Sequence, residues 1–170
     1  MGSRPKRLPW WRAHINDMKT PTYNKYIIQI AGPKFQCIEA NGQCGGGFIS
    51  PDTLDTLPKL YVVKKDGIIY YVGITTQDIR KRLRYGFSAQ GKHGYHGYKW
   101  KNQNIVELLI WCFPSNTEDQ VEAVEAELVY FIRQKTGKWP NYQMEIHFHQ
   151  ASETEMKVAR SIADMCLSEN

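Results

Sequence analysis

The sequence has no acidic residue between Ile79 and Val106. The same stretch contains seven lysines and arginines, with five aromatic residues interleaved among them. Cationic side chains contact phosphates, and aromatic rings stack on bases or pack beneath the cationic stems. The whole chain carries a net charge of +5, which alone points only weakly to a polyanionic partner. The acid-free stretch therefore favours nucleic-acid binding, and a solvated basic loop is the alternative.

Several other signals are missing. No apolar run approaches the roughly 20 residues of a membrane-spanning helix, so we expect no membrane association. The basic N-terminus has no apolar stretch behind it, so we expect no secretory signal. The four cysteines lack any metal-binding spacing, which is typical of reduced thiols in a cytoplasmic protein. The glycine-rich segment at 42–47 lacks the Gly-Lys-Ser/Thr ending of a phosphate-binding loop.

The segment LYVVKKDGIIYYVG, residues 60–73, has the pattern of a β-hairpin, with two apolar runs around a Lys-Asp-Gly turn. A three-residue turn with Gly67 in the left-handed conformation would place Tyr61 directly opposite Tyr71 on one face. A two-residue Asp-Gly turn would shift the pairing and separate the two tyrosines. The sequence leaves both turns open, and with them the question of whether the tyrosines meet.

Short elements are predicted on both sides of this hairpin. Residues 25–32 alternate as a strand, whereas residues 33–58 are rich in glycine and proline and are expected to form a loop. After the hairpin, a helix can begin with Thr75 or Thr76 as its cap and end at Gly86. Its inward-facing residues would be Ile79 and Leu83.

The second half of the chain predicts two strands and two helices. Residues 105–113 have the composition of a buried strand, and residues 117–136 form the strongest helical pattern, with a capping box at the start and Gly137 as the stop. Residues 143–149 alternate as a strand, and a final amphipathic helix follows Ser152. The fold class is therefore α+β, with about three core strands in a small antiparallel sheet flanked by helices.

The helix at 117–136 places one glutamate near its apolar side. At about 100° per residue, Glu125 lies roughly 60° from the centre of that side, whereas Glu127 and Glu122 lie roughly 95° and 125° away. A carboxylate at the core boundary requires a compensating partner, such as a cation or a bound metal. Alternatively, the stem of Glu125 packs against the core while its carboxylate reaches water.

Taken in order, these pieces resemble the GIY-YIG nuclease family, and its stand-alone bacterial members in particular. KLY at 59–61 is similar to the first motif and YVG at 71–73 to the second, with the family's ten-residue step between the tyrosines. IRKRLR resembles the arginine-bearing helix that follows, and VEAELV resembles the helix that carries the metal-binding glutamate, here Glu125. The chain departs from the family at Lys59 and Leu60, where a Gly-Ile pair is usual.

The resemblance implies hydrolysis of DNA phosphodiester bonds with one divalent metal, Mg²⁺ or Mn²⁺. It assigns activation of the attacking water to Tyr61, and orientation of the water or the phosphate to Tyr71. Because a tyrosine ordinarily holds its proton up to about pH 10, a nearby cation must help. The remaining roles fall to Arg82 on the scissile phosphate, Glu125 on the metal, and His96 or Tyr85 in proton transfer.

Other basic residues are expected to contact nucleic acid beyond the scissile phosphate. Helix geometry does not separate Arg82 from Arg80, and only the match to the family's second arginine selects Arg82. Asn141 is the candidate for the asparagine that the family usually has near the end of its core. The expected nucleic-acid contacts are Arg80, Arg84, Lys92, Lys99 and Lys101.

The resemblance covers roughly residues 58–149, which we expect to form the nuclease core. Residues 1–57 would then be an N-terminal arm with a glycine-rich extension, and residues 150–170 a C-terminal amphipathic helix that packs on the core or supports a homodimer on DNA. A metal-dependent endonuclease is the leading hypothesis. The second is a nucleic-acid-binding module of the same fold without catalysis, and the third is a small partner-binding protein that uses its final helix.

Overall fold

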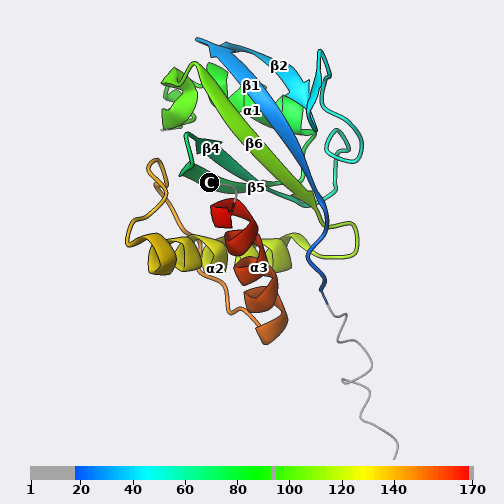
Figure 1. Ribbon diagram of the computed structural model, residues 1–170, viewed down its shortest axis with the longest axis vertical. Coiled ribbons are helices and arrows are strands. Elements are labelled where there is room, and N and C mark those ends of the chain that lie inside the picture. Colours follow the sequence, from blue (N-terminus) through cyan, green and yellow to red (C-terminus); the bar gives the residue numbers. More distant parts are fainter. Residues whose placement is uncertain (1–17, 93–94, 169–170) are drawn as a thin grey trace, which may run out of the picture.

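A six-stranded antiparallel sheet organises the computed structural model, in which residues 18–92 and 95–168 are described (Figure 1). Its spatial order is β3-β2-β1-β6-β4-β5. The α+β class predicted from the sequence is confirmed, but the sheet has six strands rather than about three. The strands are β1 (Tyr23–Ala31), β2 (Lys34–Ala40), β3 (Gln43–Cys44), β4 (Lys59–Lys65), β5 (Ile68–Thr75) and β6 (Ile105–Cys112).

The extra strands come from the segment before the hairpin. β1 confirms the strand predicted at 25–32, and it pairs with both β2 and β6. The loop predicted for 33–58 is wrong over β2 and β3, which fold back onto β1. These two strands lie at the outer side of the sheet; only one residue of β2 is buried, and both residues of β3 are exposed, so neither carries the strong apolar pattern that identifies a buried strand. The segment at 23–44 therefore widens the sheet.

Helices cover both faces of the sheet. α1 (Ile79–Ser88) and the short 3-10 helix η3 (Lys99–Asn102) pack on one face, in an apolar cluster with Tyr61 and Val63 of β4. α2 (Glu118–Thr136) and α3 (Glu153–Ser168) pack on the other face, in a cluster with Leu60 and Val62. The alternation of β4 therefore directs Tyr61 towards α1, and the final helix packs on the domain as expected.

The ends of α2 are as predicted from the sequence, whereas the ends of α1 are not. α2 begins with the predicted Thr117 capping box and ends at Gly137, which has a φ of 74°. α1 does not begin at Thr75 or Thr76, because the side chain of Asp78 caps it instead. It also does not end at Gly86 but continues to Ser88, since a glycine inside a helix destabilises it only modestly. The N–H of Ser152 donates to Glu155 Oε2 at 2.6 Å at the start of α3.

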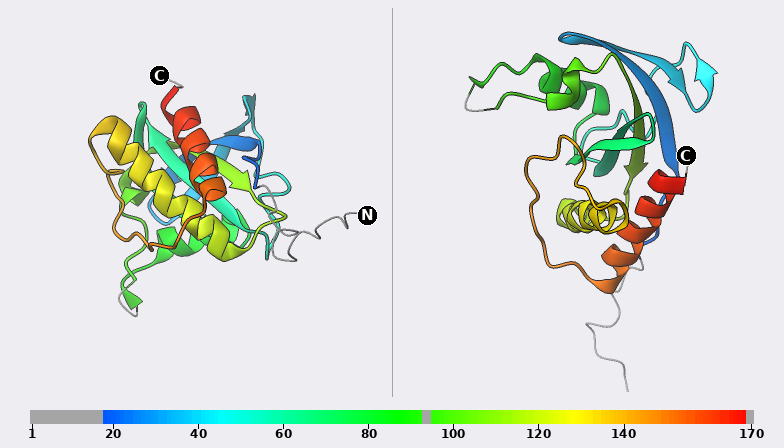
Figure 2. Two further views of the ribbon diagram at one scale, coloured as in Figure 1. Left: turned by 90° about the horizontal axis from the view of Figure 1, so that it is seen from below. Right: turned by 60° about the vertical axis from the view of Figure 1, so that its left-hand side comes forward.

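The strand predicted at 143–149 does not form. The N–H groups of Asn141 and Tyr142 donate to β5 carbonyls, at 3.2 and 2.7 Å. The pairing stops there because the Gln143 side-chain oxygen, not a backbone carbonyl, accepts from the next β5 donor, the N–H of Val72, at 3.0 Å. The chain then runs around α2 to the start of α3 (Figure 2).

The cysteines and the helix lengths bear on two expectations from the sequence. All four cysteines are free thiols. None of the helices in the described ranges combines the length and the apolar character that crossing a membrane requires.

Candidate active site

A β-bulge in the hairpin brings Tyr61 and Tyr71 to the same face of the sheet. The turn is the two-residue Asp-Gly form, with φ values of 50° and 73°, which alone would place the tyrosines on opposite faces. The pairing then shifts by one residue at Tyr70, so that Tyr61 pairs with Gly73 and Tyr71 lies diagonally beside it. Their ring centroids are 6.0 Å apart. The expectation that this turn would separate the tyrosines is therefore wrong.

Gly73 provides the space in which the two rings meet. A Cβ atom at Gly73 would lie 2.6 Å from Tyr71 Cε1 and 2.7 Å from the Tyr61 hydroxyl oxygen. Both rings are held by packing, so a methyl group there would displace one of them. The glycine of the YVG motif is thus explained by the contact between the two tyrosines.

We expect Gly73→Ala to destabilise the fold by about 1–3 kcal/mol, the usual range for overpacking a filled site. Urea denaturation measures the loss. Gly47→Ala is the matched control, because a Cβ atom there would meet only Arg80 Nη2, at an ordinary 3.6 Å. Equal stability of Gly73→Ala and the wild type would contradict the close contact at Gly73.

A third tyrosine completes the cluster, and sequence reasoning did not assign it to the site. The hydroxyl groups of Tyr98 and Tyr61 lie 2.9 Å apart, and the Tyr98 ring centroid is 5.6 Å from that of Tyr71. Burial, followed by the charge of Tyr61, raises the pKa of Tyr98 well above its ordinary value. Tyr98 therefore keeps its proton and can donate a hydrogen bond to the Tyr61 oxygen.

One local signal could have revealed Tyr98. Gly86 lies inside α1, where glycine is unfavourable, and a Cβ atom there would approach the Tyr98 ring to 2.1 Å. The Tyr98 N–H also donates to the Gly86 carbonyl at 3.1 Å. The glycine that we expected to end the helix instead admits a side chain from the acid-free stretch.

Arg82 brings a positive charge to these tyrosines from α1. Its guanidinium carbon lies 5.5 Å from the centre of the Tyr98 ring. Burial alone would lower the pKa of Arg82, but the neighbouring hydroxyls of Tyr61 and Tyr98 outweigh it and raise that pKa. Arg82 Nε is buried and has no hydrogen-bond partner among residues 18–92 and 95–168. A charged fork with an unused donor can receive an anionic oxygen.

Glu125 lies half-buried on α2, at the boundary of the core. Burial, reinforced by the nearby charge of Glu122, raises the pKa of Glu125 to about 8, although Arg82 opposes the rise. The pKa of Tyr71 is also raised, first by burial and then by the charges of Tyr61 and Glu125. Glu125, Tyr71 and Arg82 therefore lie within electrostatic reach of one another.

A divalent cation fits this carboxylate as a site that the substrate would complete. In the part of the chain that the structure describes, no group of three or more His, Cys, Asp or Glu residues could hold a metal. Mg²⁺ is commonly bound through one or two carboxylates, with waters and substrate phosphates as its other ligands. Glu125 supplies one carboxylate whose ionisation is disfavoured without a cation, and such a carboxylate gains from binding one.

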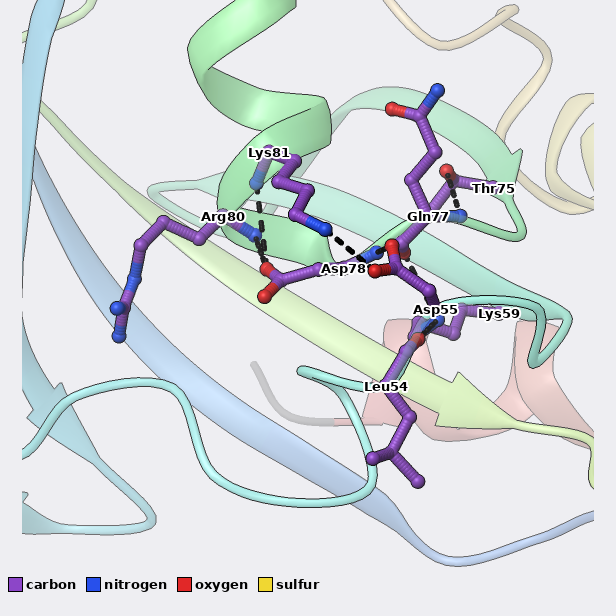
Figure 3. A network of polar contacts seen from close by, with 8 residues as sticks. All are labelled: Leu54, Asp55, Lys59, Thr75, Gln77, Asp78, Arg80 and Lys81. Carbon is purple, nitrogen blue, oxygen red and sulfur yellow. Dashed lines mark hydrogen bonds and ion pairs between the residues drawn. The ribbon is translucent and has the colours of Figure 1, made fainter.

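A polar network around the buried Lys59 fixes the start of α1, and with it the position of Arg82 (Figure 3). Lys59 is fully buried, and burial lowers the pKa of its amine. Asp78 caps the helix by accepting from two of its N–H groups, and Asp55 forms an ion pair with Lys81 at 2.5 Å. The Lys59 ammonium donates to the carbonyls of Leu54, Leu57 and Gln77, at 2.6, 2.8 and 2.9 Å.

The structure does not join Tyr85 or His96 to the three tyrosines by any hydrogen bond within the described residues. Tyr85 is 57% exposed and stacks on Tyr95, with ring centroids 5.1 Å apart. His96 is exposed, and its ring packs against Gly91 of its own loop. The hydroxyl of Tyr95 is buried, and burial raises its pKa. The charge of Arg82 opposes that rise, which places Tyr95 closer to the site than Tyr85 or His96.

The remaining predicted residues lie around this centre. Lys92 and Lys99 are exposed, whereas the Lys101 ammonium donates to the carbonyls of Ala89 and His96 and so holds its own loop. Asn141 is exposed beside the outer edge of β5. Two further basic residues, Arg80 and Arg84, are exposed on α1.

One comparison with known proteins matches the part of the chain that contains these residues. The family model described as the GIY-YIG catalytic domain matches residues 60–138, a range that contains both hairpin tyrosines, Arg82, Tyr98 and Glu125. Neither the curated proteins nor the solved structures include a significant match. The fold and the family match define a protein with a nuclease-type domain. Residues 60–138 form a GIY-YIG domain, the domain of the GIY-YIG nucleases.

Proposed function

We propose that this protein is a divalent-metal-dependent endonuclease that hydrolyses phosphodiester bonds in DNA. The observation that carries the proposal is the joining of Tyr61, Tyr71 and Tyr98 with the charged Arg82, within electrostatic reach of Glu125. These groups match the needs of the reaction: a proton acceptor for water, a cation for the phosphate and an oxygen ligand for a metal.

We propose that Tyr61 reacts as the phenolate, whose oxygen takes the proton from the attacking water and becomes the neutral hydroxyl. Negative charge on its oxygen is stabilised by the hydroxyl of Tyr98, 2.9 Å away, and by the nearby Arg82 guanidinium. Tyr71, whose pKa is raised, stays neutral and orients the water or a phosphate oxygen. As the water oxygen bonds to phosphorus, the bond from phosphorus to the 3′ oxygen breaks.

Arg82 and Glu125 are proposed to handle the negative charge of the phosphate. The Arg82 fork, with its unpartnered Nε, binds non-bridging oxygens of the scissile group. Glu125 holds Mg²⁺ or Mn²⁺, which when bound supplies Lewis-acid stabilisation of the phosphate and the leaving oxygen.

Cleavage of supercoiled plasmid by the full chain tests the proposal. We expect nicking or linearisation with Mg²⁺ or Mn²⁺ and none with EDTA, and a loss of about 100-fold or more in Tyr61→Phe. Discrete products would additionally show sequence specificity. No cleavage with either metal would contradict the proposal.

A second candidate is a binding module of the same fold that has lost catalysis. Two observations favour it: Tyr61 is 0% exposed, and the described residues contain no multi-ligand metal cluster. This alternative predicts DNA binding that weakens steeply with salt, together with an absence of cleavage. The plasmid experiment therefore separates the two candidates.

Tyr98→Phe tests whether the third tyrosine acts through Tyr61. The variant keeps the ring against Gly86 but removes the hydroxyl, so we expect kcat to fall about 10- to 100-fold and the limb on which activity rises with pH to move. A purely structural role would leave that limb in place. Tyr130→Phe is the matched control, because it also removes one tyrosine hydroxyl hydrogen bond, to Gln134, on the exposed surface of α2.

A further inference from the structure

A basic groove lies between β2 and α1. It has a volume of about 580 Å³ and is lined by residues of β2, of the loop at 47–48 and of α1. None of its lining residues is acidic. The residues that matter to its chemistry are Lys34, Phe35, Gln36, Phe48, Arg80 and Arg84.

The floor of the groove is a rigid aromatic layer. The Phe35 ring packs against Phe87 of α1, with centroids 5.3 Å apart, and against Phe48 at 6.3 Å. Phe48 in turn packs on Tyr26 at 4.9 Å, and the Tyr26 hydroxyl donates to the buried carboxylate of Asp52 at 2.6 Å. The extra strands are therefore fastened to the helix that carries Arg82, so the groove keeps a fixed position relative to the active site.

The walls of the groove carry exposed positive charge. At about 100° per residue, Arg80 and Arg84 lie roughly 40° apart on α1, and Arg82 lies roughly 160° from each of them. Figure 3 shows the Arg80 side chain pointing away from the network around Lys81. Within the described ranges, no ion pair involves Lys34, Arg80 or Arg84.

These features favour an extended polyanion as the occupant. The cations stand on long, exposed side chains above an open floor, whereas a site for a small anion would enclose its ligand with buried donors. Phosphates of a nucleic-acid backbone meet several such cations in sequence, and each contact releases counterions. One helix thus presents Arg82 to the active site and two further arginines to the groove.

We infer that this groove binds the sugar-phosphate backbone of the DNA substrate away from the cut, with Lys34, Arg80 and Arg84 as its phosphate contacts. The inference rests on the proposed function and assigns a role to the segment before the nuclease core. β2 supplies one wall of the groove, so the added strands enlarge the DNA-binding surface formed by α1.

The test is the salt dependence of DNA binding by the full chain, measured by fluorescence anisotropy with a labelled duplex in EDTA. For the double variant Lys34→Ala/Arg84→Ala, we expect the slope of log affinity against log salt to flatten by about 2, since each phosphate contact contributes about 0.9. The affinity at the lowest salt concentration should fall at least tenfold. The control variant Lys138→Ala/Lys157→Ala removes the same charge from exposed positions outside the groove.

Each outcome decides the matter. A flatter slope in the groove variant alone supports the inference. Equal changes in both variants would show that loss of net charge alone explains the flatter slope, and would overturn the inference. Unchanged binding by the groove variant, with plasmid cleavage intact, would also overturn it while leaving the proposed function standing. If the wild type binds no DNA at all, the proposed function fails together with the groove.

Discussion

Glu125→Gln is expected to abolish metal-dependent cleavage, lowering kcat by about 10³-fold or more, because a metal contributes several kcal/mol of transition-state stabilisation. The amide has nearly the same shape as the carboxylate but cannot supply an anionic ligand. Plasmid cleavage under single-turnover conditions measures the loss. Glu127→Gln on the same helix is the matched control and should retain activity.

The same substitution is expected to stabilise the metal-free protein. The pKa of Glu125 is about 8 in the folded state, above the value of about 4.3 for an unperturbed glutamate. At low pH both states hold the proton, and no penalty arises. As the pH rises towards 8, the Glu125 carboxyl ionises in the unfolded chain but stays protonated in the folded chain. The wild type therefore loses stability relative to Glu125→Gln. We expect the difference to grow to about 2–4 kcal/mol between pH 5 and pH 8.5.

Mg²⁺ should reverse that order. A cation that binds only the folded wild type stabilises it by an amount that grows with the metal concentration, whereas Glu125→Gln should gain almost nothing. Urea denaturation at pH 5 and pH 8.5, with Mg²⁺ and with EDTA, gives all four comparisons. If Mg²⁺ does not change the stability of the wild type at pH 8.5, Glu125 binds no metal, even if the plasmid is cleaved.

Local periodicity was sufficient to place Glu125. The apolar spacing of 117–136 determines which side of α2 is buried, and the capping box and Gly137 determine its ends, so the glutamates of that helix could be ranked by their distance from its apolar side. The hairpin was predictable for the same reason, because both strands carry strong apolar runs.

The positions of Tyr71 and Tyr98 depend on tertiary structure. The one-residue shift at Tyr70 that turns Tyr71 towards Tyr61 has no local signature, although it decides which face of the sheet Tyr71 occupies. Tyr98 reaches Tyr61 only because Gly86, on another element, leaves space for its ring. β2 was missed because an outer strand with one buried residue carries only a weak apolar pattern, and it is held in the sheet by its pairing with β1.

Arg82→Lys is expected to lower kcat by about 10²- to 10³-fold, even though it keeps a positive charge, since that is the usual loss when one oxyanion donor is removed. Lysine has no fork and no donor at the position of the buried Nε, so it can reach at most one phosphate oxygen at a time. Single-turnover cleavage at saturating DNA separates this loss from a change in binding.

Arg160→Lys controls for the packing part of that change. Arg160 lies 5.0 Å from the Phe131 ring centre on the surface of α3, so the variant replaces the guanidinium of a cation–π contact by an ammonium without touching the tyrosines. Both variants should lose up to about 1 kcal/mol of stability, but only Arg82→Lys should lose activity.

Arg80→Lys should raise KM for DNA rather than lower kcat, because Arg80 lies on the groove side of α1. Loss of kcat in Arg80→Lys with activity retained in Arg82→Lys would exchange the two roles, and would place the scissile phosphate on the other side of the helix.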